Sequence, residues 1–123
     1  MNVKLFDSEL RVMDVLWREG DISAKAIAQI LSRSIGWNKN TTYTVIKKCV
    51  DKGAIERIEP NFVCHALINK EQAREYELHE LAKKLFDGST DLLFVSLLEQ
   101  KNLPADVIEK LKNMVGASGG KTE

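Results

Sequence analysis

Threonines and lysines are concentrated on one side of the segment 38–53. A helix that begins near Asn38 or Asn40, at about 100° per residue, separates its polar and apolar side chains onto opposite faces. Lysines neutralise phosphates, and threonine offers a hydroxyl and a methyl group to base edges. This face is therefore suited to a DNA groove, although the solvated side of an ordinary amphipathic helix is the alternative. The polar face carries Asn40, Thr41, Thr44, Lys47, Lys48 and Asp51, and the apolar face carries Thr42, Tyr43, Val45, Ile46, Cys49 and Val50.

A strand, a turn and a second strand are expected after this helix. Gly53 is a suitable left-handed residue to end the helix, and residues 54–58 then alternate as in a half-buried strand. Glu59-Pro60-Asn61 is a turn signal, and residues 62–67 indicate the second strand. Arg57 would lie on this hairpin, where it can reach a phosphate or a minor groove. The alternative for Arg57 is a surface ion pair with one of the two neighbouring glutamates.

Two further helices are expected upstream. Apolar residues recur at helical spacing from a start near Asp7 or Ser8, and either residue can cap that helix. Ser23 is a suitable cap for the second helix, and a short connection leads from there into the threonine-rich segment. Trp17 and Trp37 are interpreted as core fillers between the three helices, because no cluster of aromatic residues for base stacking accompanies them.

The expected elements define a mainly α fold with a small β-hairpin wing. Three helices followed by a hairpin are the order of a winged helix-turn-helix domain, which we expect over residues 1–69. A C-terminal helical dimerisation domain is expected over residues 70–123, with a frayed tail from residue 116.

Charge is distributed unevenly along a chain whose net charge is zero. Residues 1–70 carry eleven Lys and Arg against eight Asp and Glu, or +3, whereas residues 71–123 carry seven against ten, or −3. Residues 21–58 alone carry seven basic and three acidic residues, or +4. The chain is therefore no general polycation, and its basic surplus surrounds the threonine-rich helix and the hairpin.

Several classes of site are not indicated. Cys64-His65 is a weak metal signal, because adjacent strand residues point to opposite faces and the chain has only two Cys and two His. We expect no metal, no cofactor and no enzymatic activity, since neither a phosphate-binding glycine loop nor a nucleophile–base pair is visible. Both cysteines are expected to be reduced, and without a signal peptide or membrane-spanning run the protein is expected in the cytoplasm, with no direct membrane binding.

The C-terminal third is predicted to be helical and is unusually apolar. Asn69 can cap a helix, with Gln72 in the reciprocal capping position. Residues 92–98 are apolar nearly all round, and leaving such a helix in water costs several kcal/mol at roughly 25 cal/mol per Å². A second copy of the same segment is the expected cover, and folding of the tail onto its own winged-helix domain is the alternative. The residues expected at this dimer interface are Leu81, Leu85, Leu92, Leu93, Phe94, Leu97, Leu98, Ile108 and Leu111.

The chain resembles the BlaI/MecI family of bacterial repressors, also called penicillinase repressors, from about residue 5 to 115. The resemblance implies a homodimer that binds a palindromic operator, with half-sites about one or two helical turns apart, and blocks transcription. Family targets include genes for β-lactamase, a resistant penicillin-binding protein or copper transporters. The residues that carry the resemblance are Leu10-x-x-Met13-x-x-x-Trp17, Trp37-Asn38-Lys39-Asn40-Thr41-Thr42 with Thr44, Asp51-Lys52-Gly53-Ala54-Ile55, and the tail segment Leu92 to Glu99.

The resemblance also implies roles by position. In the β-lactam branch, a membrane sensor triggers proteolysis of the repressor, and the corresponding bond here would be Ser96-Leu97. Staphylococcal members have an Asn-Phe pair there, so this chain departs from the pattern at that bond. Copper-responsive relatives carry a C-terminal Cys-x-Cys motif, and a tail without cysteine argues against copper sensing. The implied DNA-binding residues are Thr41, Thr44, Lys47 and Lys48 for operator bases and backbone, Asn40 and Thr42 as caps or supports of the helix start, and Arg57 on the wing.

A winged-helix module for protein assembly is the alternative function. Its third helix would pack against a protein and should expose apolar anchors. The outer face expected here, with Thr41, Thr44 and Lys48, supplies none, and this favours DNA as the partner.

Overall fold

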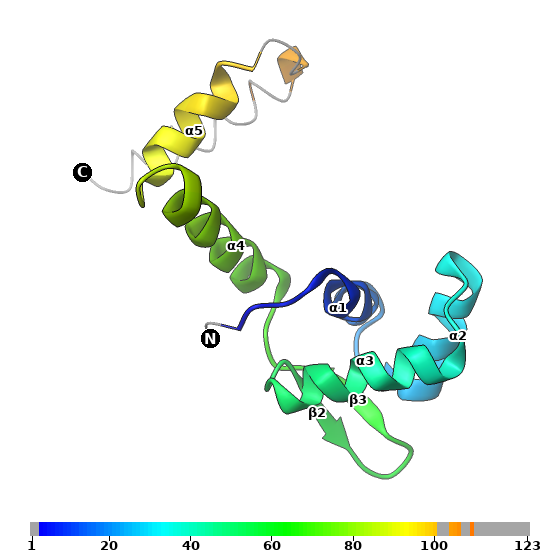
Figure 1. Cartoon of the computed structure of the whole chain (residues 1–123). Helices are drawn as coiled ribbons and strands as arrows, with labels where there is room; N and C mark the ends of the chain where they lie inside the picture. The colour runs from blue at the N-terminus through cyan, green and yellow to red at the C-terminus, as the bar shows by residue number, and fades with distance from the viewer. Residues whose placement is uncertain (1–2, 101–103, 107–108, 110–123) are drawn as a thin grey trace. The chain divides into compact units, whose positions relative to one another are not determined.

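The computed structural model describes residues 3–100, 104–106 and 109 (Figure 1). Contacts divide the chain into two compact units, Met1–Leu78 and His79–Glu123. The described part is mainly helical with one small antiparallel sheet, and the predicted fold class is confirmed. Its elements are α1 (Asp7–Glu19), β1 (Ile22–Ser23), α2 (Ala24–Ile35), α3 (Lys39–Asp51), β2 (Ile55–Ile58), β3 (Val63–Ala66), α4 (Lys70–Leu85) and α5 (Thr90–Leu98).

The start of α1 differs from the expectation. Phe6, rather than Asp7 or Ser8, occupies the N-cap position, and its backbone N–H donates to Glu9 Oε1 at 2.7 Å. A glutamate three residues into a helix can thus satisfy a free amide when the cap residue has no polar side chain. Glu9 is only 1% exposed, so this carboxylate belongs to the interior of the first unit.

The caps of α2 and α3 are made by side chains. Ser23 Oγ accepts from the Ala26 N–H at 3.1 Å, which confirms the predicted cap of α2. Asn38 Oδ1 accepts from the Thr41 N–H at 2.8 Å, so α3 is capped by Asn38. Asn40 and Thr42 were expected to cap or support this helix start, but both lie within α3, and an N-cap must precede the first helical residue.

The sheet of the first unit has three strands in the order β1-β3-β2. The expected hairpin of β2 and β3 is present, with Ile55 opposite Ala66 and Ile58 opposite Val63, and it lies beside α3 (Figure 1). The strand β1 was not expected, since Ile22 and Ser23 were interpreted only as the lead into α2, with Ser23 as its cap. Its two residues pair with the far side of β3, and the Ala24 N–H donates to the Phe62 carbonyl at 2.9 Å.

Buried aliphatic residues from α1, α2, α3 and the sheet form one core in the first unit. Met13, Ile27, Ile46 and Ile55 are the largest of its fully buried apolar side chains, each at most 1% exposed. The two tryptophans pack against this core, as predicted.

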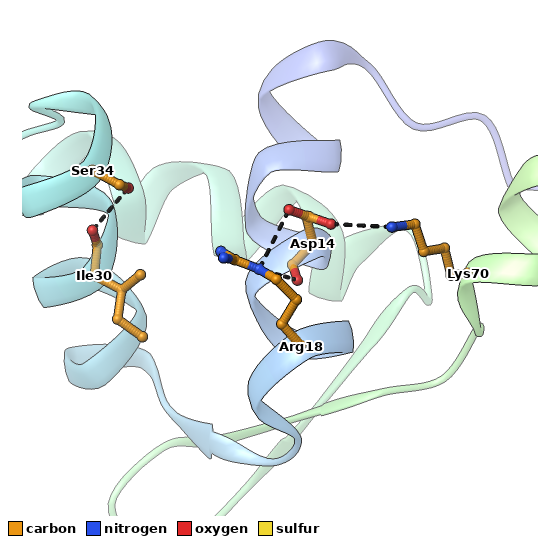
Figure 2. Close-up of polar contacts among 5 residues, drawn as sticks. All are labelled: Asp14, Arg18, Ile30, Ser34 and Lys70. Carbon is orange, nitrogen blue, oxygen red and sulfur yellow. Dashed lines mark hydrogen bonds and ion pairs between the residues drawn. The ribbon is translucent and has the colours of Figure 1, made fainter.

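Polar contacts at the start of α4 tie this helix to α1. Asn69 and Gln72 cap each other's backbone N–H groups at 2.7 and 2.8 Å, which confirms the predicted reciprocal cap. Trp17 Nε1 donates to the Ile68 carbonyl at 3.0 Å. Figure 2 shows Asp14 between Arg18 of its own helix and Lys70 of α4, with both ion pairs at 3.6 Å. Figure 2 also shows Ser34 of α2, whose hydroxyl donates to the Ile30 carbonyl.

The second unit contains the end of α4 and the whole of α5. Ser89 caps α5 by accepting from the Leu92 N–H at 3.1 Å. Leu93 is 6% exposed, whereas Leu85 and Leu92 are 73% and 51% exposed. Ile108 and Leu111, expected at a dimer interface, lie outside the described residues. Among the described helices, none has the length and apolarity that crossing a bilayer requires.

Candidate nucleic-acid interface

The outer face of α3 presents short polar and basic side chains. Asn40, Thr41, Thr44, Lys47 and Lys48 are all exposed, as the helical periodicity predicted. Neither lysine forms an ion pair with any other residue that the structure describes. Two free ammonium groups and two threonines on one helical face are suited to phosphates and base edges.

The hydroxyl group of Thr44 already forms a hydrogen bond within α3, which the sequence did not indicate. Its hydroxyl donates to the Asn40 carbonyl one turn earlier, at 2.9 Å. The donor is therefore engaged within the helix, while the oxygen lone pairs and the methyl group still face outward. Thr44 can accept a hydrogen bond from an exocyclic amino group of adenine or cytosine, or pack its methyl group on thymine.

Thr42 points into the protein. Its side chain is fully buried, and its hydroxyl oxygen has no hydrogen-bond partner among the residues that the structure describes. The residue can support α3 only through packing, because a buried hydroxyl cannot reach a ligand at the outer face. The expectation that Thr42 belongs to the DNA-binding residues is therefore wrong, apart from its support of α3 through packing.

Basic side chains of α2 extend the face of α3, and these cations were not among the predicted DNA-binding residues. Lys25 and Arg33 of α2 line a surface hollow of about 280 Å³ together with Lys39, the first residue of α3. The other lining residues are Ala28, Gln29 and Ser32. The helix before a recognition helix usually crosses the DNA backbone, and cations at this position can neutralise phosphates.

A run without acidic residues was the signal that could have revealed this extension. Residues 22–50 contain no Asp or Glu and five basic residues. This run covers the whole of α2 and all of α3 except its last residue, Asp51. Because the two helices pack against each other, their shared surface carries no carboxylate before that residue. The net charge of +4 was counted over residues 21–58, which include three acidic residues near the ends of the segment. That count did not reveal the acid-free run between them.

Arg57 of the wing is held by contacts with Glu59 and Phe62. Its Nε donates to Glu59 Oε1 at 3.0 Å, and its guanidinium carbon lies 3.7 Å from the centre of the Phe62 ring. The alternative of a surface ion pair with a neighbouring glutamate is therefore present in the structure. Phe62 in turn lies 6.2 Å, between ring centres, from Tyr43 of α3. The wing cation is thus linked through two aromatic rings to the helix that carries the threonines.

An interior ion pair fixes the far end of α3. Lys52 Nζ lies 2.6 Å from Glu9 Oε1 and donates to the Lys4 carbonyl at 2.9 Å. It also lies 4.3 Å from the centre of the Phe6 ring. Both ends of α3 are therefore held, the N-terminal end by Asn38 and the C-terminal end by Lys52, and a rigid helix presents its side chains with little loss of conformational entropy.

The two cysteines are buried and form no disulfide. Burial raises the pKa of Cys49 to about 12, and the nearby Glu9 carboxylate contributes to the increase. Burial also raises the pKa of Cys64 to about 11. Thiols in this state are protonated at neutral pH and are poor nucleophiles.

Comparison with known proteins agrees with this geometry. The family model described as penicillinase repressor matches residues 5–117. The solution structure of the DNA-binding domain of the repressor BlaI superimposes with a TM-score of 0.53 at 26% identity, covering 57% of this chain and 88% of that chain.

Two curated relatives match nearly the whole length. The penicillinase repressor of Bacillus licheniformis is 24% identical over 110 residues, which cover 88% of this chain and 86% of the relative. The methicillin resistance regulatory protein MecI of Staphylococcus aureus is 25% identical over 114 residues, covering 91% of this chain and 93% of the relative. The chain belongs to the penicillinase repressor family of transcriptional repressors, and it is not an enzyme.

Proposed function

We propose that this repressor binds a palindromic DNA operator as a homodimer, with one winged-helix domain (residues 1–69) on each half-site. The observation that carries the proposal is that α2 and α3 contain no acidic residue before Asp51, while their exposed side chains include two threonines and five cations. Thr41 and Thr44 would contact base edges, Lys47 and Lys48 would contact phosphates, and Arg57 would reach the backbone or the minor groove from the wing.

The phosphate contacts would extend onto α2. Lys25, Arg33 and Lys39 surround one hollow, and none of them forms an ion pair among the described residues. With Lys47, Lys48 and Arg57 they give six cations per protomer for the DNA backbone. Such contacts supply affinity and register, whereas the threonines supply preference among sequences.

The helical part, residues 70–123, would form the dimer. In the second unit, leucines of α4 and α5 are exposed: Leu81 is 39%, Leu85 73%, Leu92 51% and Leu97 38% exposed. Phe94 and Leu98 are half-buried, and Leu93 is already buried within its own chain. A second copy of this segment would remove the exposed apolar area from water, and a two-fold interface would present two α3 helices to one duplex.

Proteolytic cleavage of α5 would release the repressor from DNA. The bond between Ser96 and Leu97 lies within this helix, and cleavage there would separate Leu97 and Leu98 from the rest of the dimer surface. A protease controlled by a membrane sensor would perform the step. Because the relatives are named for penicillinase and methicillin resistance, we propose genes of β-lactam resistance as the targets.

Selection from a pool of random duplexes by the full-length protein tests DNA recognition. We expect a palindromic sequence to be enriched. Lys48→Ala should weaken binding to all duplexes alike, whereas Thr44→Ala should reduce the preference for the selected sequence by about tenfold. Equal and negligible effects of both substitutions would contradict the assigned face. Binding to DNA with no dependence on salt concentration would favour a protein-assembly module instead.

Sedimentation tests the dimer. Leu92→Asp places a charge at the proposed interface and should yield monomers, because a buried carboxylate without a partner is costly. Leu67→Asp is the matched control, since Leu67 is 43% exposed but follows β3 in the winged-helix domain. An intact dimer of the Leu92→Asp protein would refute the interface.

A further inference from the structure

Arg57 shares its position on the wing with an acidic residue. The side chain of Arg57 is 51% exposed and that of Glu59 is 58% exposed, and 3.0 Å separates Nε from Oε1. Phe62 supports the guanidinium from one side at 3.7 Å. The cation that is best placed on the wing to contact DNA is therefore already paired, unlike the lysines on the outer face of α3.

The two charges cannot be presented to DNA separately. They lie two residues apart on one hairpin, and the Phe62 stack and its Tyr43 neighbour hold Arg57 next to α3. Any phosphate that approaches Arg57 must also approach Glu59. The phosphate then competes with the carboxylate for the same guanidinium, and the two anions repel each other.

We propose that Glu59 is an affinity-determining residue of the DNA interface, which holds binding below the strength that the remaining cations would give. The inference rests on the proposed DNA-binding function. An exposed ion pair is weak enough to be exchanged for a phosphate, so Glu59 lowers affinity without abolishing the contact. A repressor tuned in this way leaves its operator more readily when its concentration falls.

Glu56 provides a matched control on the same strand. Adjacent strand residues point to opposite faces, so Glu56 and Arg57 face different ways. Glu56 is exposed, lies opposite His65 in the sheet, and forms no ion pair among the described residues. Replacing it changes the net charge of the wing by the same amount without releasing Arg57.

The test compares Glu59→Gln, Glu56→Gln, Arg57→Ala and the double variant Arg57→Ala/Glu59→Gln as full-length proteins. Glutamine keeps an acceptor for Arg57 Nε and removes only the charge. The probe is the duplex that the wild-type protein selects from a random pool, with affinity measured by fluorescence anisotropy at several salt concentrations. Thermal unfolding establishes that each variant is folded.

We expect Glu59→Gln to tighten binding by about two- to fivefold and to steepen the salt dependence by up to about one unit per protomer. Glu56→Gln should produce less than half of this gain. Glu59→Gln should have little effect once Arg57 is alanine, because the residue acts through Arg57.

Equal gains from Glu59→Gln and Glu56→Gln would overturn the inference in favour of net charge alone. An undiminished gain in the Arg57→Ala background, or no gain in either background, would also overturn it. All these results leave the proposed function intact. A wild-type protein that binds no duplex would instead refute the proposed function, and this inference with it.

Discussion

Removal of the Lys52 ammonium tests how the winged-helix domain holds α3 in place. Lys52→Met keeps the aliphatic part of the side chain near Phe6 but removes the ion pair with Glu9 and the hydrogen bond to the Lys4 carbonyl. Glu9 is 1% exposed and cannot turn to water without opening the core. Its remaining partner is the Phe6 N–H at 2.7 Å.

The expected loss of stability follows from this burial. Removing one partner of a buried ion pair costs about 3–5 kcal/mol, because the other charge stays buried without compensation. The Phe6 N–H retains part of the stabilisation, and the Lys52 side chain was itself 29% exposed, so we expect a value near the lower limit, about 3 kcal/mol. In a domain of this size each kcal/mol lowers Tm by roughly 4–8 °C, so a fall of at least about 12 °C is expected.

Urea and thermal unfolding of Lys52→Met, Glu9→Gln and their double variant measure this effect. The double variant should be more stable than Lys52→Met alone, because glutamine keeps an acceptor for the Phe6 N–H without a buried charge. Lys48→Met is the control: this exposed lysine of α3 has no ion pair among the described residues and should change stability by less than about 0.5 kcal/mol. A loss below about 1 kcal/mol for Lys52→Met, or a double variant at least as unstable as Lys52→Met, would refute the reasoning.

Three further outcomes are expected. Lys25→Ala should lower the slope of log affinity against log salt by about 0.9 per protomer, whereas Lys83→Ala in α4 should leave it unchanged; anisotropy titrations measure both. Thr42→Val removes a buried hydroxyl that has no hydrogen-bond partner in the described part of the chain, and it should raise the free energy of unfolding by about 1 kcal/mol. A decrease of this free energy in urea titrations would contradict the prediction. Burial holds the pKa of Cys49 at about 12, above its ordinary value of 9.0, so the folded chain binds more protons above pH 9 and stability falls as pH rises from there toward 12. The free energy of unfolding of the Cys49→Ala protein, measured by denaturant titration at pH 8–11, should therefore fall less steeply with pH than that of the wild-type protein.

Local sequence signals predicted the caps of α2 and α4, whose partners are close in sequence, although they missed the cap that Phe6 and Glu9 form at α1. The Ser23 cap and the reciprocal Asn69–Gln72 cap each span three residues, and the structure confirms both. The exposure of Thr41, Thr44, Lys47 and Lys48 followed from helical periodicity in the same way. Periodicity is reliable here because α3 has one face on a continuous core.

Features that depend on distant pairings could not be read from the sequence. The strand β1 has two residues, too few for an alternating pattern, and exists because it pairs with β3 some forty residues later. The burial of Glu9 depends on Lys52, which is 43 residues away. Lys25 and Arg33 lie near Lys39 because α2 packs against α3. This proximity cannot be deduced from the charges counted along the sequence.

The wing hairpin is anchored at its base, and its turn lies outside the strand pairings. β3 is paired on both sides, with β1 and with β2, and the Phe62 carbonyl accepts from the Ala24 N–H. Residues 59–61 lie beyond these pairings. Insertions and deletions at this tip can therefore accumulate in related proteins without disturbing the helices, because exposed loop tips tolerate changes of length. Under the proposed function, a change in the length of this loop would alter the DNA contacts of the wing while the packed interior stays constant.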